Sequence, residues 1–487
     1  MISFSSLWIK AYQLIMEYTP STLASTFSPN TLIRQYVICQ RLSLIPEGWI
    51  RESLGEFWLG VHPDLPVNHG LSENSRFRVC FLGDVIDPFA GKFNCPSLED
   101  HPQVIQSFDD FEAYLHRLSG RFVCVVTNGE STRIYLDASG SLPLVFDVSQ
   151  QIASSSLMVI PYGGEVDDDS ALIELFKFHQ QNGIYPFGLT PRKKIKRVLP
   201  NHYLCLDSWC VIRHWPSCSF KKEPDRTDLA EKVGGLLEST ISTILKQGYK
   251  PYMSLTAGVD SRTLLACTLP KYRQNIHYFT WELPDATAMQ DVATASSVSR
   301  GCGVKYSSYP YKVAKRKDQL KWLYRTSLSI GEVRGQSITT TVSQMDAKQP
   351  YIAGNVSLIT LGKYWREGDD KLETLAAKDV VQRLRIPESA SILQAAEEWL
   401  SSLPSLSVRE VTDLLYLEQR VGCWGSEIGS GHADGPFHIY PLSNRKIFEW
   451  SLQAQGSQVE RSQKALFTGV IRLKSPDLLR WAFNGRE

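Results

Sequence analysis

The chain has 487 residues, and 52 lysines and arginines against 51 aspartates and glutamates leave a formal net charge of +1. This balance indicates no polyanionic partner, and the length allows two or three domains with sizeable cores. Ten cysteines without a Cys-x-x-Cys pair favour reduced thiols in a cytoplasmic protein. No apolar run approaches a membrane span, and Lys10 and Glu17 interrupt the start of the chain, which therefore does not resemble a signal peptide.

The first part of the chain is rich in strand patterns. β-Branched and aromatic residues form runs at 77–82, 121–126 and 133–137, and turn residues follow each run. Residues 108–118 instead carry apolar side chains at helical spacing, which predicts one amphipathic helix.

The second part alternates between strand and helix patterns. A polar stretch at 220–228 predicts a linker that ends in a helix cap, and a long amphipathic helix is expected over 229–245. Expected strands are 252–255, 276–281 and 304–309, and expected helices are 262–267 and 291–300. Such alternation predicts a parallel sheet with crossover helices. From Asp379 onward the patterns are mainly helical, most clearly over 407–422.

The most informative stretch is the turn between the strand at 252–255 and the helix that opens at Arg262. Its small residues, Thr256, Ala257 and Gly258, let the backbone close around an anion, and the helix start supplies unpaired N–H groups. Ser261 can donate a hydrogen bond, and Asp260 can hold Mg²⁺ against phosphate oxygens. No Gly-Lys-Ser/Thr ending is present, so γ-phosphoryl transfer is not the natural interpretation. The simpler alternative is a strand–turn–helix with an Asp-Ser cap.

This stretch resembles the pyrophosphate loop of the N-type ATP pyrophosphatases, usually Ser-Gly-Gly-x-Asp-Ser, with Thr256 and Ala257 in place of the first Ser and Gly. Further segments then resemble the asparagine synthetase family, which includes β-lactam synthetases and lasso-peptide cyclases. In the second half these are Gln290-Asp291-Val292-Ala293, Gly331-Glu332 with Ser337, Pro441-Leu442-Ser443 with Arg445 and Glu449, and Gln463-Lys464 with Phe467 and Gly469-Val470. In the first half, residues 118–123, 137–144 and 195–204 resemble the glutaminase-like domain of that family. Residues 1–70 match no family segment.

The resemblance implies an α+β N-terminal domain over residues 1–220, with the packed antiparallel sheets of an Ntn hydrolase. Over 221–487 it implies an α/β synthetase domain of the N-type ATP pyrophosphatase (adenine nucleotide α-hydrolase-like) fold. The implied protein is a ligase that uses ATP and Mg²⁺ to adenylate a carboxylate and join it to an amine. Lys464 is the implied catalytic cation and Asp260 the implied metal ligand. The implied nucleotide-binding residues are Ser254, Leu255, Thr256, Ala257, Gly258, Asp260, Ser261, Thr280 and Gly354.

Two departures from the family pattern stand out. Ile2 occupies the position of the family's nucleophilic cysteine, so glutaminase activity is expected to be absent. Leu358 or Ile359 stands where a second Mg²⁺-binding carboxylate is expected. Either another carboxylate (Glu332, Asp369 or Asp370) substitutes, or Mg²⁺ is held by Asp260, phosphates and water.

Other polar residues carry less specific patterns. Glu418 could be a base for the attacking amine, although an ion pair on a helix surface is the favoured interpretation. Trp424 could line an acceptor pocket, but an aromatic residue there is more often part of a core. His432, Asp434 and His438 lack zincin spacing and are interpreted as loop residues, and the basic run at 192–197 as a solvated loop.

The sequence leaves the substrate open. Small-molecule or peptide carboxylates and amines are the expected partners, from a specialised metabolite, peptide or surface glycan. A homodimer is one option, and binding to nucleic acid or to a membrane is not expected. The main alternative is a non-catalytic nucleotide-binding or scaffold protein of the same descent. A tRNA-thiolating pyrophosphatase is a distant third, because no cysteine pair or basic face supports it.

Overall fold

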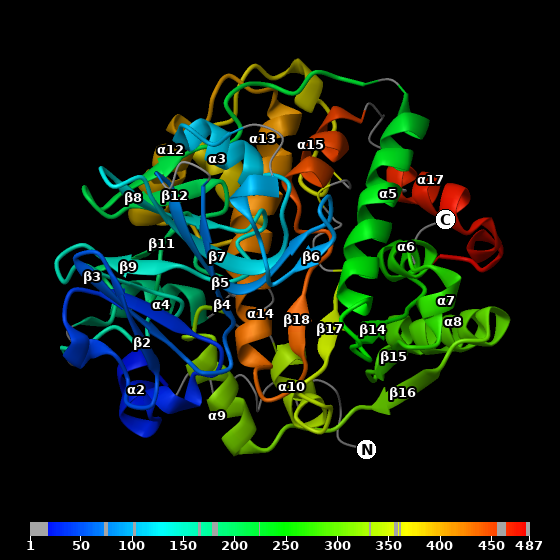
Figure 1. Cartoon of the computed structure of the whole chain (residues 1–487), viewed down its shortest axis with the longest axis horizontal. Coiled ribbons are helices and arrows are strands. Elements are labelled where there is room, and N and C mark those ends of the chain that lie inside the picture. The colour runs from blue at the N-terminus through cyan, green and yellow to red at the C-terminus, as the bar shows by residue number, and fades with distance from the viewer. Residues whose placement is uncertain are drawn as a thin grey trace.

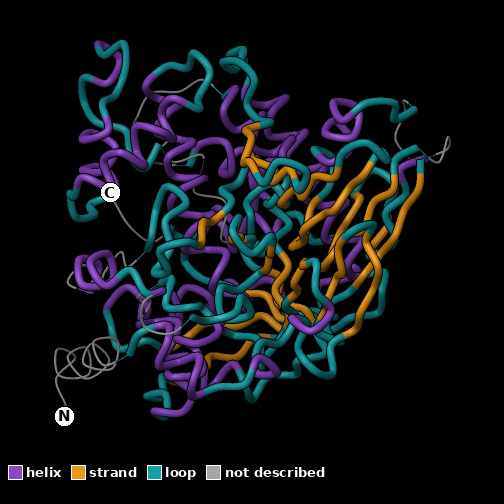
Figure 2. The backbone as a smooth tube through the Cα atoms, turned by 90° about the vertical axis from the view of Figure 1, so that its left-hand side faces the viewer, coloured by secondary structure: helices purple, strands orange, loops and turns teal. Residues whose placement is uncertain are grey.

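The computed structural model describes residues 18–72, 76–100, 104–163, 167–177, 184–223, 225–330, 333–354, 359, 362–454 and 464–483. The predictions that concern Ile2, Glu332, Leu358 and Gln463 lie outside these ranges. Within them, every helix is too short or too polar to cross a bilayer. The protein is a mixed α/β structure with several sheets, and Figure 2 shows the strands gathered toward one side of the molecule.

Residues before 220 form two antiparallel sheets. The first has the order β11 (Ile195–Arg197), β9 (Val145–Asp147), β10 (Ile152–Ser154), β1 (Tyr36–Cys39), β3 (Phe57–Val61), β2 (Ile50–Leu54). The second has the order β13 (Cys210–Arg213), β12 (His202–Cys205), β8 (Thr132–Leu136), β7 (Ser119–Thr127), β5 (Arg78–Asp87), β4 (Val67–Leu71), and β6 (Lys92–Phe93) pairs with β5. The strands expected at 77–82, 121–126 and 133–137 are therefore confirmed as β5, β7 and β8.

The second sheet is apolar on both faces, because each face meets a different layer. Leu82 and Val123 belong to the core that the two sheets share, whereas Phe81 and Phe122 belong to a core on the other face. Successive side chains of a strand alternate between faces, so such strands carry nearly continuous apolar runs. The second of these cores includes Phe111 of α3 (Phe108–Leu115), which covers that face.

Residues after 220 form a parallel sheet with helices around it. Its order is β16 (Tyr306–Pro310), β15 (His277–Glu282), β14 (Tyr252–Ser254), β17 (Pro350–Ile352), β18 (Phe437–Ile439). All its described pairs are parallel, as the alternating pattern predicts. The antiparallel sheets end at Arg213 and the parallel sheet begins at Tyr252. The domain boundary at residue 220 falls between them and stays a prediction.

Helices lie around these sheets (Figure 1). They are α2 (Pro20–Thr26), α4 (Ser170–Lys177), α5 (Arg226–Leu245), α6 (Val259–Ala266), α7 (Pro270–Arg273), α8 (Ala286–Cys302), α9 (Arg316–Arg325), α10 (Val333–Val342), α11 (Ala377–Leu384), α12 (Ala390–Ser401), α13 (Val408–Leu414), α14 (Ser426–Gly431), α15 (Arg445–Gln453) and α17 (Ala465–Lys474). Local signals set several ends: Asp225 caps the N–H groups at the start of α5, and Gly303, at φ +62°, ends α8. The helix expected over 407–422 changes at Leu415 into a π-helix, Leu415–Gly425.

A buried polar junction joins the two halves of the chain, and its first part centres on Asp137. Ser443 donates its hydroxyl to the Asp137 carboxylate at 2.6 Å, and the Ser139 hydroxyl donates to the same oxygen at 2.9 Å. All three side chains are at most 1% exposed. Segments 137–144 and 441–445, which the sequence analysis singled out separately, therefore meet inside the protein.

The second part of the junction centres on Glu418, in the π-helix. Arg213 donates to both carboxylate oxygens, at 2.6 and 2.8 Å, and the Trp399 indole N–H donates at 2.6 Å. Asn201 donates to Glu418 and accepts from Arg445. Because Arg213 and Asn201 come from the first half, this network fixes β12 and β13 against the π-helix and α15.

Candidate functional site

The nucleotide-binding residues expected from the sequence lie at the carboxyl ends of β14, β15 and β17. Ser254 ends β14, and Leu255 follows it with its carbonyl accepting from the Thr280 hydroxyl of β15. Gly354 comes just after β17, so close to α6 that a Cβ atom there would lie 3.4 Å from the Cβ of Asp260. Ligands of parallel α/β sheets bind at this edge, where crossover connections leave a crevice.

The turn from Thr256 to Ser261 is held by its own side chains. The Ser261 hydroxyl oxygen accepts from the Thr256 N–H at 3.0 Å, and the Thr256 hydroxyl oxygen accepts from the Gly258 N–H at 3.0 Å. The Ala257 N–H donates to the Asp291 carboxylate at 2.9 Å. These bonds fix the turn in one conformation and use the N–H groups of its first three residues. An anion would therefore meet the next N–H groups along the chain.

Those next N–H groups belong to the first turn of α6. Gly258 is the N-cap residue of this helix and supplies no side-chain cap. Asp260 and Ser261 lie within that first turn, beside the positive end of the helix dipole. The sequence alternative of an Asp-Ser cap is wrong in detail, because the cap position is Gly258. The structure here has the elements of an anion-binding helix start.

Lys464 contacts Asp260 although 204 residues separate them. The Lys464 ammonium lies 2.8 Å from the Asp260 carboxylate, and the two side chains are 19% and 26% exposed. Lys464 has left-handed backbone geometry, φ +56°, and immediately precedes α17. α17 packs against α5 and α6, and Figure 1 shows it beside both. The packing of α17 thus positions the lysine over the start of α6.

Arg262 ties the same turn to the C-terminal segment. Its buried guanidinium donates to the Ala257 carbonyl at 2.6 Å and to the carbonyls of Trp481 and Ala482 at 2.7 and 3.0 Å. Burial lowers the pKa of Arg262 to about 10, which still leaves the group charged near neutral pH. The sequence analysis missed this role, and no local pattern marks it, because the C-terminal acceptors lie about 220 residues away.

Several cations interact with Tyr416, a buried residue whose pKa the Asp260 charge also raises. Burial raises the pKa of Tyr416, Arg420 opposes that rise, and the Asp260 charge adds to it, which places Tyr416 within electrostatic reach of both. The Lys363 ammonium lies 5.6 Å from the Tyr416 ring centroid. Burial lowers the pKa of Lys363, and Arg420 and Arg385 lower it further. The cluster of Lys363, Arg385 and Arg420 would attract a phosphate or carboxylate.

Asp369 and Asp370, considered above as substitute metal ligands, are engaged elsewhere. Arg383 donates to Asp369 at 2.6 and 2.8 Å, and Arg409 pairs with Asp370 at 2.5 Å. Both aspartates line a separate cavity of about 410 Å³ whose walls contain no residue of the Thr256–Ser261 turn. The structure therefore does not bring them to the predicted metal position.

Glu418 is not on a helix surface, which corrects the interpretation favoured from sequence. It is fully buried in the junction, and Arg213, Trp399 and Asn201 all donate to it. Burial raises the pKa of Glu418, but Arg213 and these hydrogen bonds outweigh that effect and hold it below its usual value. A carboxylate so occupied has little capacity to take a proton from an amine. Its role as a base stays a prediction, and the geometry favours a structural role.

His432 and Asp434 lie in a turn after α14, as the loop interpretation expected, whereas His438 lies in β18. His432 is buried, and its Nε2 lies 3.0 Å from the Gly335 carbonyl. His438 is buried in β18, and Asp434 pairs with Arg325 at 2.7 Å. Arg192, at the start of the basic run, is buried as well and donates to the carbonyls of Leu157 and Ile160. Packing therefore encloses His432, His438 and Arg192. The basic run is solvated only in part: its three lysines, Lys193, Lys194 and Lys196, are exposed, and residues 195–197 form β11 rather than a loop.

Comparisons with known proteins assign no family. No family model matches the chain, and no curated protein is similar to it. One similar solved structure is described as the allosteric regulatory enzyme of purine biosynthesis. The two share 9% identity at a TM-score of 0.23, and the match covers 63% of this chain and 63% of that one. A likeness of this size supports no conclusion about activity.

The residues at the turn offer a magnesium nucleotide one protein ligand, the carboxylate of Asp260. Mg²⁺ prefers oxygen ligands and commonly keeps several waters. No group of three metal-ligating side chains gathers at the turn among the residues that the structure describes. A bound Mg²⁺ would therefore rest on Asp260 with phosphate and water oxygens, which is one of the two options that the sequence left open.

Proposed function

We propose that this protein is an ATP-dependent ligase that adenylates a substrate carboxylate and joins it to an amine, in the manner of the asparagine synthetase family. The observation that supports the proposal is the contact between Lys464 and Asp260. The resemblance selects these two residues independently, from segments about 200 residues apart, as the catalytic cation and the metal ligand. Their contact at the carboxyl edge of a parallel sheet fits one active site.

Each residue of this site has a definite task in the proposed reaction. The substrate carboxylate attacks the α-phosphorus of ATP, and the bond to pyrophosphate breaks. The first turn of α6 and Ser261 would hold the departing pyrophosphate, and Lys464 would meet the negative charge that builds up on it. Mg²⁺, when bound at Asp260, neutralises phosphate charge. The amine then attacks the acyl-adenylate, which releases AMP and one proton and leaves an amide.

Exchange of labelled pyrophosphate into ATP tests the proposal, because only a reversible adenylation produces it. The full-length protein with Mg-ATP is screened against pools of amino acids, peptides and sugar acids. We expect exchange to depend on one carboxylate pool, and nucleotide analysis to show AMP and no ADP. Exchange absent from every pool, or ADP as the nucleotide product, would contradict the proposal.

A matched pair of lysine variants makes this test specific. Lys464→Met removes the proposed catalytic cation. Lys474→Met removes a second ion-paired lysine, at the last residue of α17, whose partner is Glu238 at 3.0 Å. Loss of one preorganised donor typically costs about 10²–10³ in rate. We expect Lys464→Met to slow exchange at least about 100-fold while ATP binding, measured by calorimetry, stays near normal. Lys474→Met should exchange normally.

The second candidate is a non-catalytic nucleotide-binding or scaffold protein. The self-satisfied hydrogen bonds of the Thr256–Ser261 turn favour it, because they hold the turn in place without a ligand. This candidate predicts ATP binding without exchange in any pool and no difference between the two lysine variants. The same two measurements therefore separate the candidates.

A further inference from the structure

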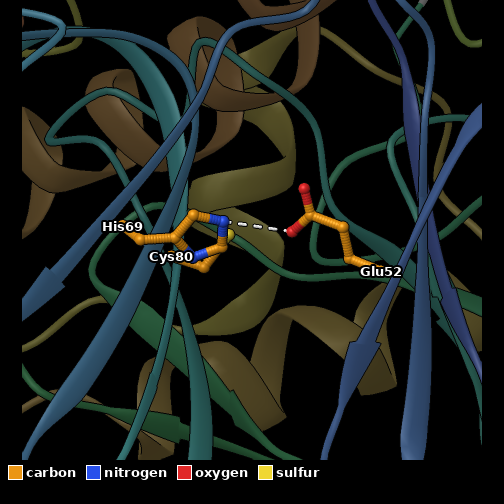
Figure 3. A group of neighbouring side chains, drawn as sticks. All are labelled: Glu52, His69 and Cys80. Carbon is orange, nitrogen blue, oxygen red and sulfur yellow. Dashed lines mark ion pairs between the residues drawn. The ribbon is translucent and has the colours of Figure 1, made fainter.

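The two antiparallel sheets meet at one open edge, where β2 and β4 are the outermost strands. Three side chains converge there: Glu52 from β2, His69 from β4 and Cys80 from β5. One ligand atom of each lies within 4.8 Å of the other two, and His69 Nε2 is 3.1 Å from a Glu52 carboxylate oxygen. Figure 3 shows Glu52 reaching from its own strand toward His69, with the Cys80 sulfur beside the imidazole.

All three residues occupy inward positions of their strands. Leu54 and Val67 pack against the core between the sheets, and Glu52 and His69 lie two residues away from them on the same faces. His69 is directly opposite Cys80 in the β4–β5 register, and Cys80 belongs to that core. The alternating pattern would place apolar side chains at all of these positions. Two of the three are instead a carboxylate and an imidazole.

The three groups differ in exposure in a way that suits a bound ion. The Cys80 residue is 2% exposed, whereas the His69 and Glu52 side chains are 61% and 33% exposed. The arrangement thus has one enclosed sulfur and two ligands that an ion can reach from solvent.

We propose that Glu52, His69 and Cys80 form a binding site for a divalent transition-metal ion of the Zn²⁺ class, with water as the fourth ligand. Thiolate and imidazole select such ions over Mg²⁺ and Ca²⁺. Tetrahedral Zn²⁺ holds sulfur at about 2.3 Å and nitrogen and oxygen at about 2.0–2.2 Å, which separates neighbouring ligand atoms by roughly 3.3–3.6 Å. The three ligand atoms, all within 4.8 Å of one another, would have to move closer together to reach this geometry. On binding, the Cys80 thiol loses its proton to solvent as the metal–sulfur bond forms.

A simpler explanation exists for two of the residues. Inward-pointing charged side chains on edge strands discourage sheets of different molecules from pairing. That explanation accounts for Glu52 and His69 but gives no reason for the position of Cys80 opposite His69. It also predicts no metal binding, so experiment distinguishes it from the proposal.

The test uses the full-length protein after treatment with a chelator. Calorimetric titration with Zn²⁺ in two buffers of different protonation enthalpy should give one ion bound and about one proton released per chain. Titration with Co²⁺ should produce the near-ultraviolet charge-transfer absorption of a thiolate ligand. Lack of stoichiometric Zn²⁺ binding, or Co²⁺ binding without that absorption, would overturn the proposal.

Matched variants assign the ligands. His69→Gln changes a largely exposed side chain and should weaken Zn²⁺ binding at least tenfold, because losing even an outer-shell partner costs about 10–100-fold. His62→Gln is its control, because His62 directly follows β3 and does not belong to the cluster. Cys80→Ser should abolish the Co²⁺ absorption, whereas Cys124→Ser, at a buried cysteine of the neighbouring strand β7, should not. If Cys80→Ser does not fold, the His69→Gln result decides, and unchanged Zn²⁺ affinity in that variant would refute the site.

Discussion

Replacing Glu418 by glutamine separates a structural role from a catalytic one. The substitution keeps the shape of the side chain and removes its charge. Arg213 would then remain with its guanidinium enclosed, since its side chain is only 7% exposed. Because that charge would have lost its partner, we expect Glu418→Gln to destabilise the whole protein rather than to slow a chemical step.

The structure sets the size of this effect. Breaking a buried ion pair from one side typically costs about 3–5 kcal/mol. Unfolding entropy of about 2.1 cal/mol/K per residue amounts to about 1 kcal/mol/K over 487 residues. Glu418→Gln should therefore lower Tm by about 3–5 °C. Glu397→Gln, at an exposed position of α12, should leave Tm unchanged and serves as the control.

A double variant tests the pair itself. Replacing both partners, Glu418→Met with Arg213→Met, leaves no unpaired charge and should cost less than Glu418→Gln alone. Differential scanning calorimetry measures all three proteins, and pyrophosphate exchange is measured at a temperature where all are folded. Wild-type Tm in Glu418→Gln would refute the structural reasoning. If exchange were lost at the same time, Glu418 would be the base that the sequence suggested.

Further predictions concern the turn, its anchor and the buried histidines. Asp260→Asn should abolish Mg-dependent ATP binding in calorimetry without changing the circular dichroism spectrum, and unchanged affinity would remove Asp260 from the site. Arg262→Met leaves several carbonyls without their charged donor, so it should lower the free energy of unfolding by about 3 kcal/mol. It should also make the C-terminal segment sensitive to protease. An unchanged cleavage pattern would show that Arg262 does not anchor this segment. Burial lowers the pKa of His202 and of His432 to about 4, so both stay neutral in the folded protein while unfolded histidines bind protons below about pH 6.5. The free energy of unfolding should therefore fall between about pH 6.5 and 4, by about 1.4 kcal/mol per pH unit for each histidine, and His432→Gln should make urea denaturation less pH-dependent in that range.

The sequence predicted elements whose periodicity is strong. β5 and β7 are long and almost wholly buried, and β8 ends in the buried run Ile134–Leu136. The parallel strands β14 to β16 alternate with helices, so pattern alone located all of these strands. The strands of residues 36–71 carry weaker patterns. β2 reads Ile-Arg-Glu-Ser-Leu and β4 reads Val-Asn-His-Gly-Leu, because edge strands mix polar and apolar residues. These segments form strands because they pair with other segments, and a short stretch of sequence read alone does not show such pairing.

Contacts between distant segments mark the limit of pattern reasoning at the site. The small size and the order of the turn residues predict an anion-binding helix start. Nothing in the residues around Lys464 indicates that its ammonium lies 2.8 Å from Asp260, and only the family resemblance suggested a shared site. The contact between Glu418 and Arg213 could not be predicted from local sequence either. Its helical segment gives no indication of the arginine that β13 presents to it.

The junction bears on whether this chain can be dissected. Residues 221–487 contain a complete parallel sheet, yet expressed alone they would carry Glu418 without Arg213 and Arg445 without Asn201. Both side chains would then face water across a large, newly bared surface. We therefore expect residues 221–487 to need the first half of the chain in order to stay folded. Expression of residues 221–487 as a separate fragment should give insoluble protein, whereas co-expression of the two halves as separate chains should restore solubility.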